Sequence, residues 1–163
     1  MAHRYHTLPR APDHITAANV IARILAGIGF RFYWVTDALT QKTYEFQPGP
    51  DARSILETVD HIWELLNWLY RAMDAKGTPK PAGALPLREA TLDLIARLEE
   101  AFSEMEQEEL AAIQVLKEPF WPVLNGPLSD VLTHIGQIAM MRRMAGSPVA
   151  LSNPFEGTPP PGS

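Results

Sequence analysis

The sequence predicts an all-α protein, a four-helix bundle formed by a single domain over residues 1–163. Apolar residues recur with the period of an α-helix in four long stretches, at roughly 16–40, 54–75, 88–108 and 126–145. Segments rich in proline and glycine separate these stretches, and no stretch alternates apolar and polar residues as a strand would. Helices of this kind bury their apolar stripes against one another in a bundle.

The composition agrees with one globular domain and argues against several classes of function. The 163 residues are 46% hydrophobic, which is enough for a sizeable core and too much for a disordered chain. The formal net charge of −5 disfavours a nucleic-acid partner, because such proteins usually carry a basic surface. Cysteine is absent, so disulfides, cysteine-ligated zinc and thiol nucleophiles of the chain's own are excluded.

The N-terminus has no apolar run of the kind found in signal peptides, and no stretch is long and apolar enough to span a bilayer. We therefore expect a cytoplasmic protein with no membrane partner. Residues 1–12 hold two prolines and no apolar period, so we expect a loose N-terminal arm. The proline-rich tail, NPFEGTPPPGS, is expected to be extended or disordered.

The first two helices each carry a feature that needs a reason. Gly27 and Gly29 weaken the first helix by about 1 kcal/mol each relative to alanine, for which close packing of a neighbouring helix is a plausible cause. The aromatic run at residues 30–34 is expected in the core. The second helix begins with Ser54 and Glu57 at capping-box spacing, and His61 lies beside its apolar stripe.

The glutamate-rich end of the third helix is interpreted as a solvated face, because the Asp, Asn and Gly pattern of a calcium loop is absent. Residues 110–124 are compatible with a short helix or a turn. The last helix is expected to start after Asn125 as N-cap, with Pro127 in its first turn. It is expected to end at Gly146, which can take the left-handed conformation.

The last helix also carries the most informative polar residues. Asp130 and His134 are four residues apart, so they share a face that borders the apolar stripe. Burying either group without a partner is costly. They could bond each other or their neighbours, or they could share a metal ion. A histidine on an apolar face is more often a satisfied core residue than a ligand, and Asp130 could serve only to stabilise the start of the helix.

The metal hypothesis adds His61 from the second helix, which gives two imidazoles and one carboxylate between two helices. This donor set suits zinc, nickel, iron or manganese. Three protein ligands leave positions open for water or substrate, as in catalytic sites. Candidates to support the ligands are Glu57, which also has the capping role, Gln137 and Arg142.

Two segments resemble the DinB/YfiT-like superfamily. NGPLSDVLTHIGQIAMMRRMAGSPV, at residues 125–149, resembles the signature of its final helix, and ARSILETVDHIWELL resembles the segment that holds its first histidine. The resemblance extends over most of residues 15–150. It implies an up-down-down-up four-helix bundle, commonly a homodimer, with a divalent metal on three histidines. His61 and His134 match two of these, whereas Asp130 stands where the fuller motif has the other histidine.

The resemblance implies a function of one of two kinds. Relatives include transferases and isomerases that use low-molecular-weight thiols, and proteins described as metal-dependent hydrolases. The first hypothesis is therefore a divalent-metal-dependent enzyme, a hydrolase or a thiol-dependent transferase, acting on a small molecule. In it, Asp130 gives a site of two histidines and one carboxylate. The alternative is a non-catalytic, dimeric stress or binding protein whose His/Asp cluster is degenerate or purely structural.

Overall fold

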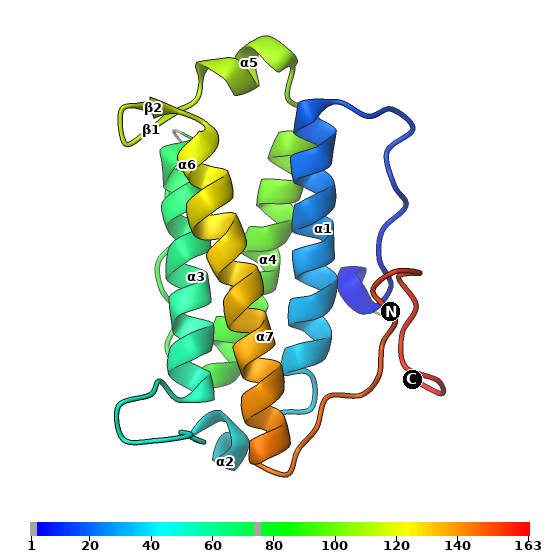
Figure 1. Cartoon of the computed structure of the whole chain (residues 1–163), viewed down its shortest axis with the longest axis vertical. Coiled ribbons are helices and arrows are strands. Elements are labelled where there is room, and N and C mark those ends of the chain that lie inside the picture. Colours follow the sequence, from blue (N-terminus) through cyan, green and yellow to red (C-terminus); the bar gives the residue numbers. More distant parts are fainter. Residues whose placement is uncertain (1–2, 74–75) are drawn as a thin grey trace.

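The computed structural model describes residues 3–73 and 76–163 and is mostly helical, which confirms the predicted all-α class. Four long helices lie side by side (Figure 1): α1 (Ala17–Thr36), α3 (Ile55–Ala72), α4 (Ala84–Ser103) and α7 (Ser129–Met144). α1 and α3 each contact both α4 and α7, so the four helices enclose one core. In Figure 1, α1 and α7 run downwards, whereas α3 and α4 run upwards.

The short element η1 (Arg4–His6) precedes the long helices, and others connect them: α2 (Gln41–Tyr44), α5 (Gln107–Ala112), β1 (Gln114–Val115), β2 (Glu118–Pro119), α6 (Trp121–Val123) and η2 (Leu124–Leu128). The two strands form a small antiparallel hairpin within residues 110–124, for which the sequence predicts a short helix or a turn. Both residues of its tight turn, Leu116 and Lys117, have positive φ, at 55° and 67°. No helix in the part of the chain that the structure describes has the length and apolar character needed to cross a bilayer.

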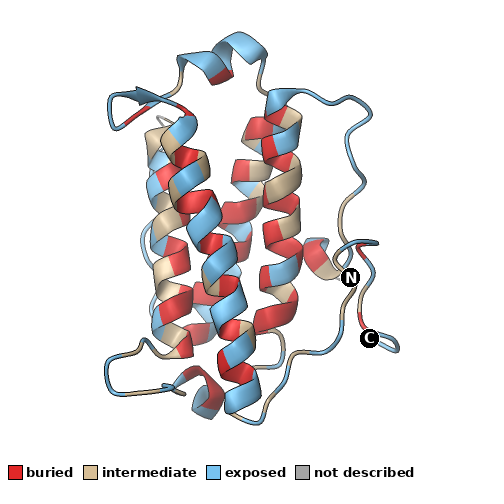
Figure 2. Cartoon of the chain, in the orientation of Figure 1, coloured by how far each residue is buried: buried red, intermediate tan, exposed pale blue. Residues whose placement is uncertain are grey.

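Buried residues (red) recur along each of the long helices in Figure 2, and the apolar stripes supply most of them. Their fully buried members come from all four helices: Leu25, Ile28 and Phe32; Ile62, Leu66 and Leu69; Ile95 and Leu98; and Ile138. Burying one such side chain stabilises the fold by about 1.5–3 kcal/mol. Phe30, Phe32 and Trp34 are also buried, which confirms that the aromatic run belongs to the core.

The helix boundaries follow the sequence signals in part. The capping box of α3 is confirmed, since Ser54 N–H donates to Glu57 Oε2 at 2.7 Å and Glu57 N–H donates to Ser54 Oγ at 3.2 Å. Gly146 ends α7 with φ of 72°, as predicted. α4 begins earlier than predicted, at Ala84, after Gly83 with φ of 94°. The predicted end of the second helix, at residues 74–75, lies outside the described residues.

The predicted start of the last helix at Asn125 is wrong. Helical structure begins at Trp121 and continues through η2, a π-helical turn that leads directly into α7. Pro127 has no N–H to donate, and Gly126 adopts a non-helical conformation (φ −93°, ψ −107°) that accommodates the break. Ser129 Oγ donates to Leu124 O at 2.6 Å across this turn.

The expectation of loose terminal arms is also wrong. Tyr5 of η1 is fully buried, and its hydroxyl donates to Glu99 Oε2 at 2.6 Å. A Cβ on Gly29 would lie 2.5 Å from the Tyr5 ring, so this glycine makes room for the arm and not for a neighbouring helix. The tail joins the arm through a hydrogen bond from Leu8 N–H to Gly157 O at 3.0 Å.

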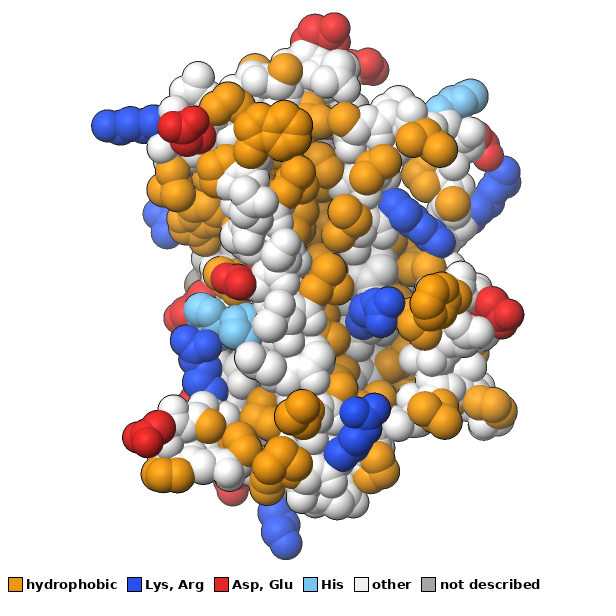
Figure 3. Space-filling model, in the orientation of Figure 1, with side chains coloured by type: hydrophobic (Ala, Val, Ile, Leu, Met, Phe, Trp, Pro, Cys, Tyr) orange, Lys and Arg blue, Asp and Glu red, His pale blue; other side chains and the backbone are white. Residues whose placement is uncertain are grey.

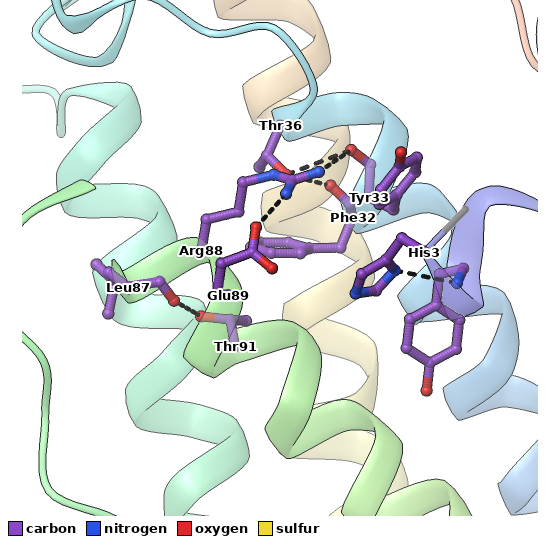
Figure 4. A network of polar contacts seen from close by, with 9 residues as sticks. His3, Phe32, Tyr33, Thr36, Leu87, Arg88, Glu89 and Thr91 are labelled. Atoms are coloured by element: carbon purple, nitrogen blue, oxygen red, sulfur yellow. Dashed lines mark hydrogen bonds and ion pairs between the residues drawn. The ribbon is translucent and has the colours of Figure 1, made fainter. Parts of the chain in front are cut away.

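A buried arginine ties α4 to the end of α1 (Figure 4). Arg88 Nε donates to Thr36 Oγ1 at 2.9 Å, and its Nη2 donates to Tyr33 O at 3.3 Å. The guanidinium lies 5.0 Å from the centre of the Tyr33 ring, and His3 stacks on the same ring at 5.1 Å. The last carbonyls of a helix have no partner within the helix, and Arg88 supplies one.

Candidate functional site

The packing of α3 against α7 brings two of the three predicted ligands together. His61 lies on α3 and His134 on α7, and their ring centroids are 4.8 Å apart with the planes at 76°. The two helices hold the rings together because the apolar residues beside them, Ile62 and Val131, are fully buried in the shared core. The pair is therefore positioned by core packing and not by a loop.

The histidine pair is accessible to solvent. The side chain of His61 is 28% exposed, and His134 is also half-buried. Figure 3 shows histidine side chains (pale blue) at the surface of the molecule, with acidic (red) and basic (blue) side chains next to them. A small molecule or an ion can therefore reach both rings without any movement of the helices.

Gln137 orients one of the two rings. His134 Nδ1 lies 2.8 Å from Gln137 Oε1, one helical turn further along α7. Because an amide oxygen carries no hydrogen, His134 Nδ1–H is the donor, and the neutral ring then has its lone pair on Nε2. Metal-binding histidines usually donate their other ring N–H to an oxygen in this way. The predicted supporting role of Gln137 therefore has a geometric basis.

The surroundings keep His61 neutral. Burial lowers the pKa of His61 from its ordinary value of 6.5, and the positive charges of Arg53 and of a protonated His134 lower it further. Glu64 and Asp130 act in the opposite direction and do not outweigh them. A neutral imidazole has a free lone pair, so His61 can act as a ligand or a proton acceptor near pH 7.

Asp130 does not complete a three-membered group with the histidines. It lies in the first turn of α7 and is exposed, although its charge still influences His61. Among residues 3–73 and 76–163, no three His, Cys, Asp or Glu side chains are grouped so that they could hold a metal ion. The ligand set of His61, Asp130 and His134 therefore stays a prediction, of which the structure brings two members into contact.

Two of the predicted supporting residues have other roles. Glu57 is engaged in the capping box, and its hydrogen bonds with Ser54 lower the pKa of its carboxyl. Arg142 is buried, and its guanidinium donates to Val35 O at 3.0 Å, Asp37 O at 2.9 Å and Ser147 O at 2.8 Å. The prediction that Arg142 supports the histidines is wrong, because its donors hold the end of α1 instead.

Charged residues that the sequence reasoning missed surround the pair. Arg53 precedes the cap of α3, and Glu64 Oε2 lies 3.9 Å from His61 Nδ1, which is too long for a hydrogen bond. Lys80 bridges Glu64 at 3.0 Å and Asp60 at 2.6 Å. The three-residue spacing of His61 and Glu64 was a usable signal for a shared helix face. Nothing local in the sequence points to Lys80, which comes from another segment.

Comparison with known proteins gives no relative: no protein-family model, no curated protein and no solved structure significantly matches this chain. The site must therefore be judged on its own chemistry. Two accessible imidazoles, one with a fixed tautomer and one held neutral, can bind a divalent metal ion or accept a proton from a bound molecule.

Proposed function

We propose that this chain is a divalent-metal-binding protein of the DinB/YfiT-like type, an up-down-down-up four-helix bundle with its site between α3 and α7. The contacts of α1 and α3 with both other long helices, and the helix directions in Figure 1, support this bundle. The single observation that carries the functional proposal is the meeting of the His61 and His134 rings at 4.8 Å from helices distant in sequence.

The chemistry of the donor set fits a transition-metal ion. In the proposal, His61 and His134 hold zinc, nickel, iron or manganese through ring nitrogens, with Gln137 fixing the tautomer of His134. Asp130, one turn before His134, supplies the carboxylate through a change of side-chain rotamer. Arg53, whose charge reaches the pair, attracts an anionic substrate to the same surface.

A bound divalent ion would supply Lewis acidity and would lower the pKa of a coordinated water or thiol. The reaction class that we propose is hydrolysis of a small molecule or transfer to a low-molecular-weight thiol. The chain's own residues bind and orient the substrate beside the ion, and His61 and His134 serve as its ligands. Homodimer formation and a cytoplasmic location belong to the same proposal, and light scattering on the purified protein tests the first.

Calorimetric titration with Zn²⁺ and Ni²⁺ tests the site. We expect stoichiometric binding by the wild-type protein, a loss of about tenfold or more in affinity for His61→Ala and His134→Ala, and about tenfold for Gln137→Ala. His14→Ala is the matched control, because His14 is exposed outside the site, and it should bind like the wild type. Wild-type affinity in both ligand variants would overturn the proposal.

A second candidate is a non-catalytic protein in which the histidines are structural. The absence of any group of three ligands among the described residues favours it. Zn²⁺ titration of the wild-type protein and of the Asp130→Asn variant together discriminates between the two. The metal proposal expects a clear loss of Zn²⁺ affinity in this variant, whereas the structural reading expects no stoichiometric Zn²⁺ binding by the wild-type protein in the first place.

A further inference from the structure

A groove runs between α1 and α7 on a face that the proposed metal site does not use. It has a volume of about 630 Å³, within the range of about 300–1,000 Å³ that is usual for small-molecule sites. Ile24, Trp34 and Val35 line it from α1, and Leu132, Ile135 and Ala139 line it from α7. Residues 149–152, between α7 and the tail, form a third wall, since the chain turns back beside α1 after α7 (Figure 1).

The charges at this groove are of one sign. The charged residues that line it, within the described part of the chain, are Arg31 and Arg143, and no Asp or Glu does. The basic lining of the groove is opposite in sign to the net charge of the whole chain, which is −5. Neither guanidinium forms an ion pair or hydrogen bond with another residue in 3–73 or 76–163. Figure 3 shows hydrophobic side chains along the line between α7 and α1, with basic side chains beside them.

Two glycines keep the groove open. Gly27 of α1 and Gly136 of α7 both line it, and a Cβ added at either would meet nothing within 4 Å. Each glycine costs its helix about 1 kcal/mol relative to alanine. Close packing explains Gly29 but not these two, because no neighbouring atom approaches them. The absence of side chains at these two glycines therefore leaves the groove open.

We propose that the α1–α7 groove binds a single-chain amphiphile with an anionic head, such as a fatty carboxylate. The two arginines lie toward the C-terminal ends of α1 and α7, which run in the same direction, so the head sits at that end. The apolar walls receive the tail over roughly 16 Å, the rise of α7 from Leu132 to Arg143. A helix from a second copy of the chain is about 10 Å wide and would have to displace residues 149–152, so the groove suits a narrow single chain better than a helix.

The test compares decanoate with decanol, both kept below their aggregation limits, by calorimetry on the full chain. We expect decanoate to bind roughly tenfold more tightly, because a carboxylate on arginine adds a charged hydrogen bond that the alcohol lacks. Arg31→Gln and Arg143→Gln should each remove most of that difference and leave decanol binding unchanged. Arg97→Gln, an exposed change on α4, is the matched control and should have no effect.

Filling the groove gives an independent test. Gly27→Leu and Gly136→Leu should each abolish binding of both probes while the melting temperature stays equal or rises, since leucine is a better helix former than glycine. Decanoate binding that survives both variants would overturn the proposal. So would a wild-type dimer that the leucine variants dissociate, because a second copy would then fill the groove. Binding to anionic vesicles without binding of monomeric decanoate would likewise overturn it, in favour of a membrane surface.

Discussion

Replacing Arg142 by methionine should destabilise the fold by about 3 kcal/mol. The change keeps the apolar stem but removes the donors that reach Val35 O, Asp37 O and Ser147 O. Val35 O is buried and the other two bonds are partly buried, so each acceptor that loses its partner costs about 1 kcal/mol. The total is a large part of the roughly 5–15 kcal/mol by which folded domains are stable. Urea unfolding followed by circular dichroism measures it, from the midpoint at constant slope.

The neighbouring residue provides the control for this experiment. Arg143→Met changes an exposed arginine on the same turn of α7 and should alter stability by less than about 0.5 kcal/mol. Arg142→Lys should fall between the two, because lysine keeps the charge but cannot present the planar fork that reaches several carbonyls together. An Arg142→Met variant whose free energy of unfolding lies within about 1 kcal/mol of the wild type would refute the stabilising role of the three Arg142 hydrogen bonds.

Two further predictions concern the arm and the histidine pair. Gly29→Ala should destabilise the fold by about 1–3 kcal/mol, because its Cβ would lie 2.5 Å from the Tyr5 ring. Gly27→Ala should be neutral or stabilising, because a Cβ there meets nothing within 4 Å. Thermal melts that rank the two variants in the opposite order would contradict this prediction. The pKa of His61, followed by NMR, should lie below 6.5 and rise in Arg53→Gln. The pKa of His61 is lower in the folded than in the unfolded state, so the free energy of unfolding should decrease as pH falls from 6.5 through the folded pKa. His61→Ala should reduce this decrease.

The sequence was informative where the structure depends on local rules. The helical period located all four long helices. The Ser54–Glu57 capping box marked the start of α3 and Gly146 marked the end of α7, because each signal acts within one turn of the helix. The start of α7 could not be obtained in this way. Asn125 and Pro127 have the character of a helix start, but core packing carries the helix through a π-helical turn at this point.

The remaining differences arise from contacts between residues distant in sequence. The docking of Tyr5 needs Glu99 and the space at Gly29, which no local pattern reveals. The meeting of His61 and His134 was predicted from their places beside two apolar stripes. Asp130 shares a face with His134 by spacing, yet it lies in the exposed first turn of α7. Arg142 was misassigned because its partners, the carbonyls of Val35 and Asp37, lie at the C-terminal end of α1, far away in the sequence.

The arginines that hold the end of α1 affect how the chain folds. Arg88 reaches Thr36 across 52 residues, and Arg142 reaches Val35 across 107 residues. The last turn of α1 is therefore complete only after α4 and α7 have both docked. Closing such long loops precedes the gain from these contacts, so we expect folding to be slower than in bundles held together by local contacts. Amide hydrogens in this turn should exchange with solvent mainly through global unfolding, unlike those of a frayed helix end.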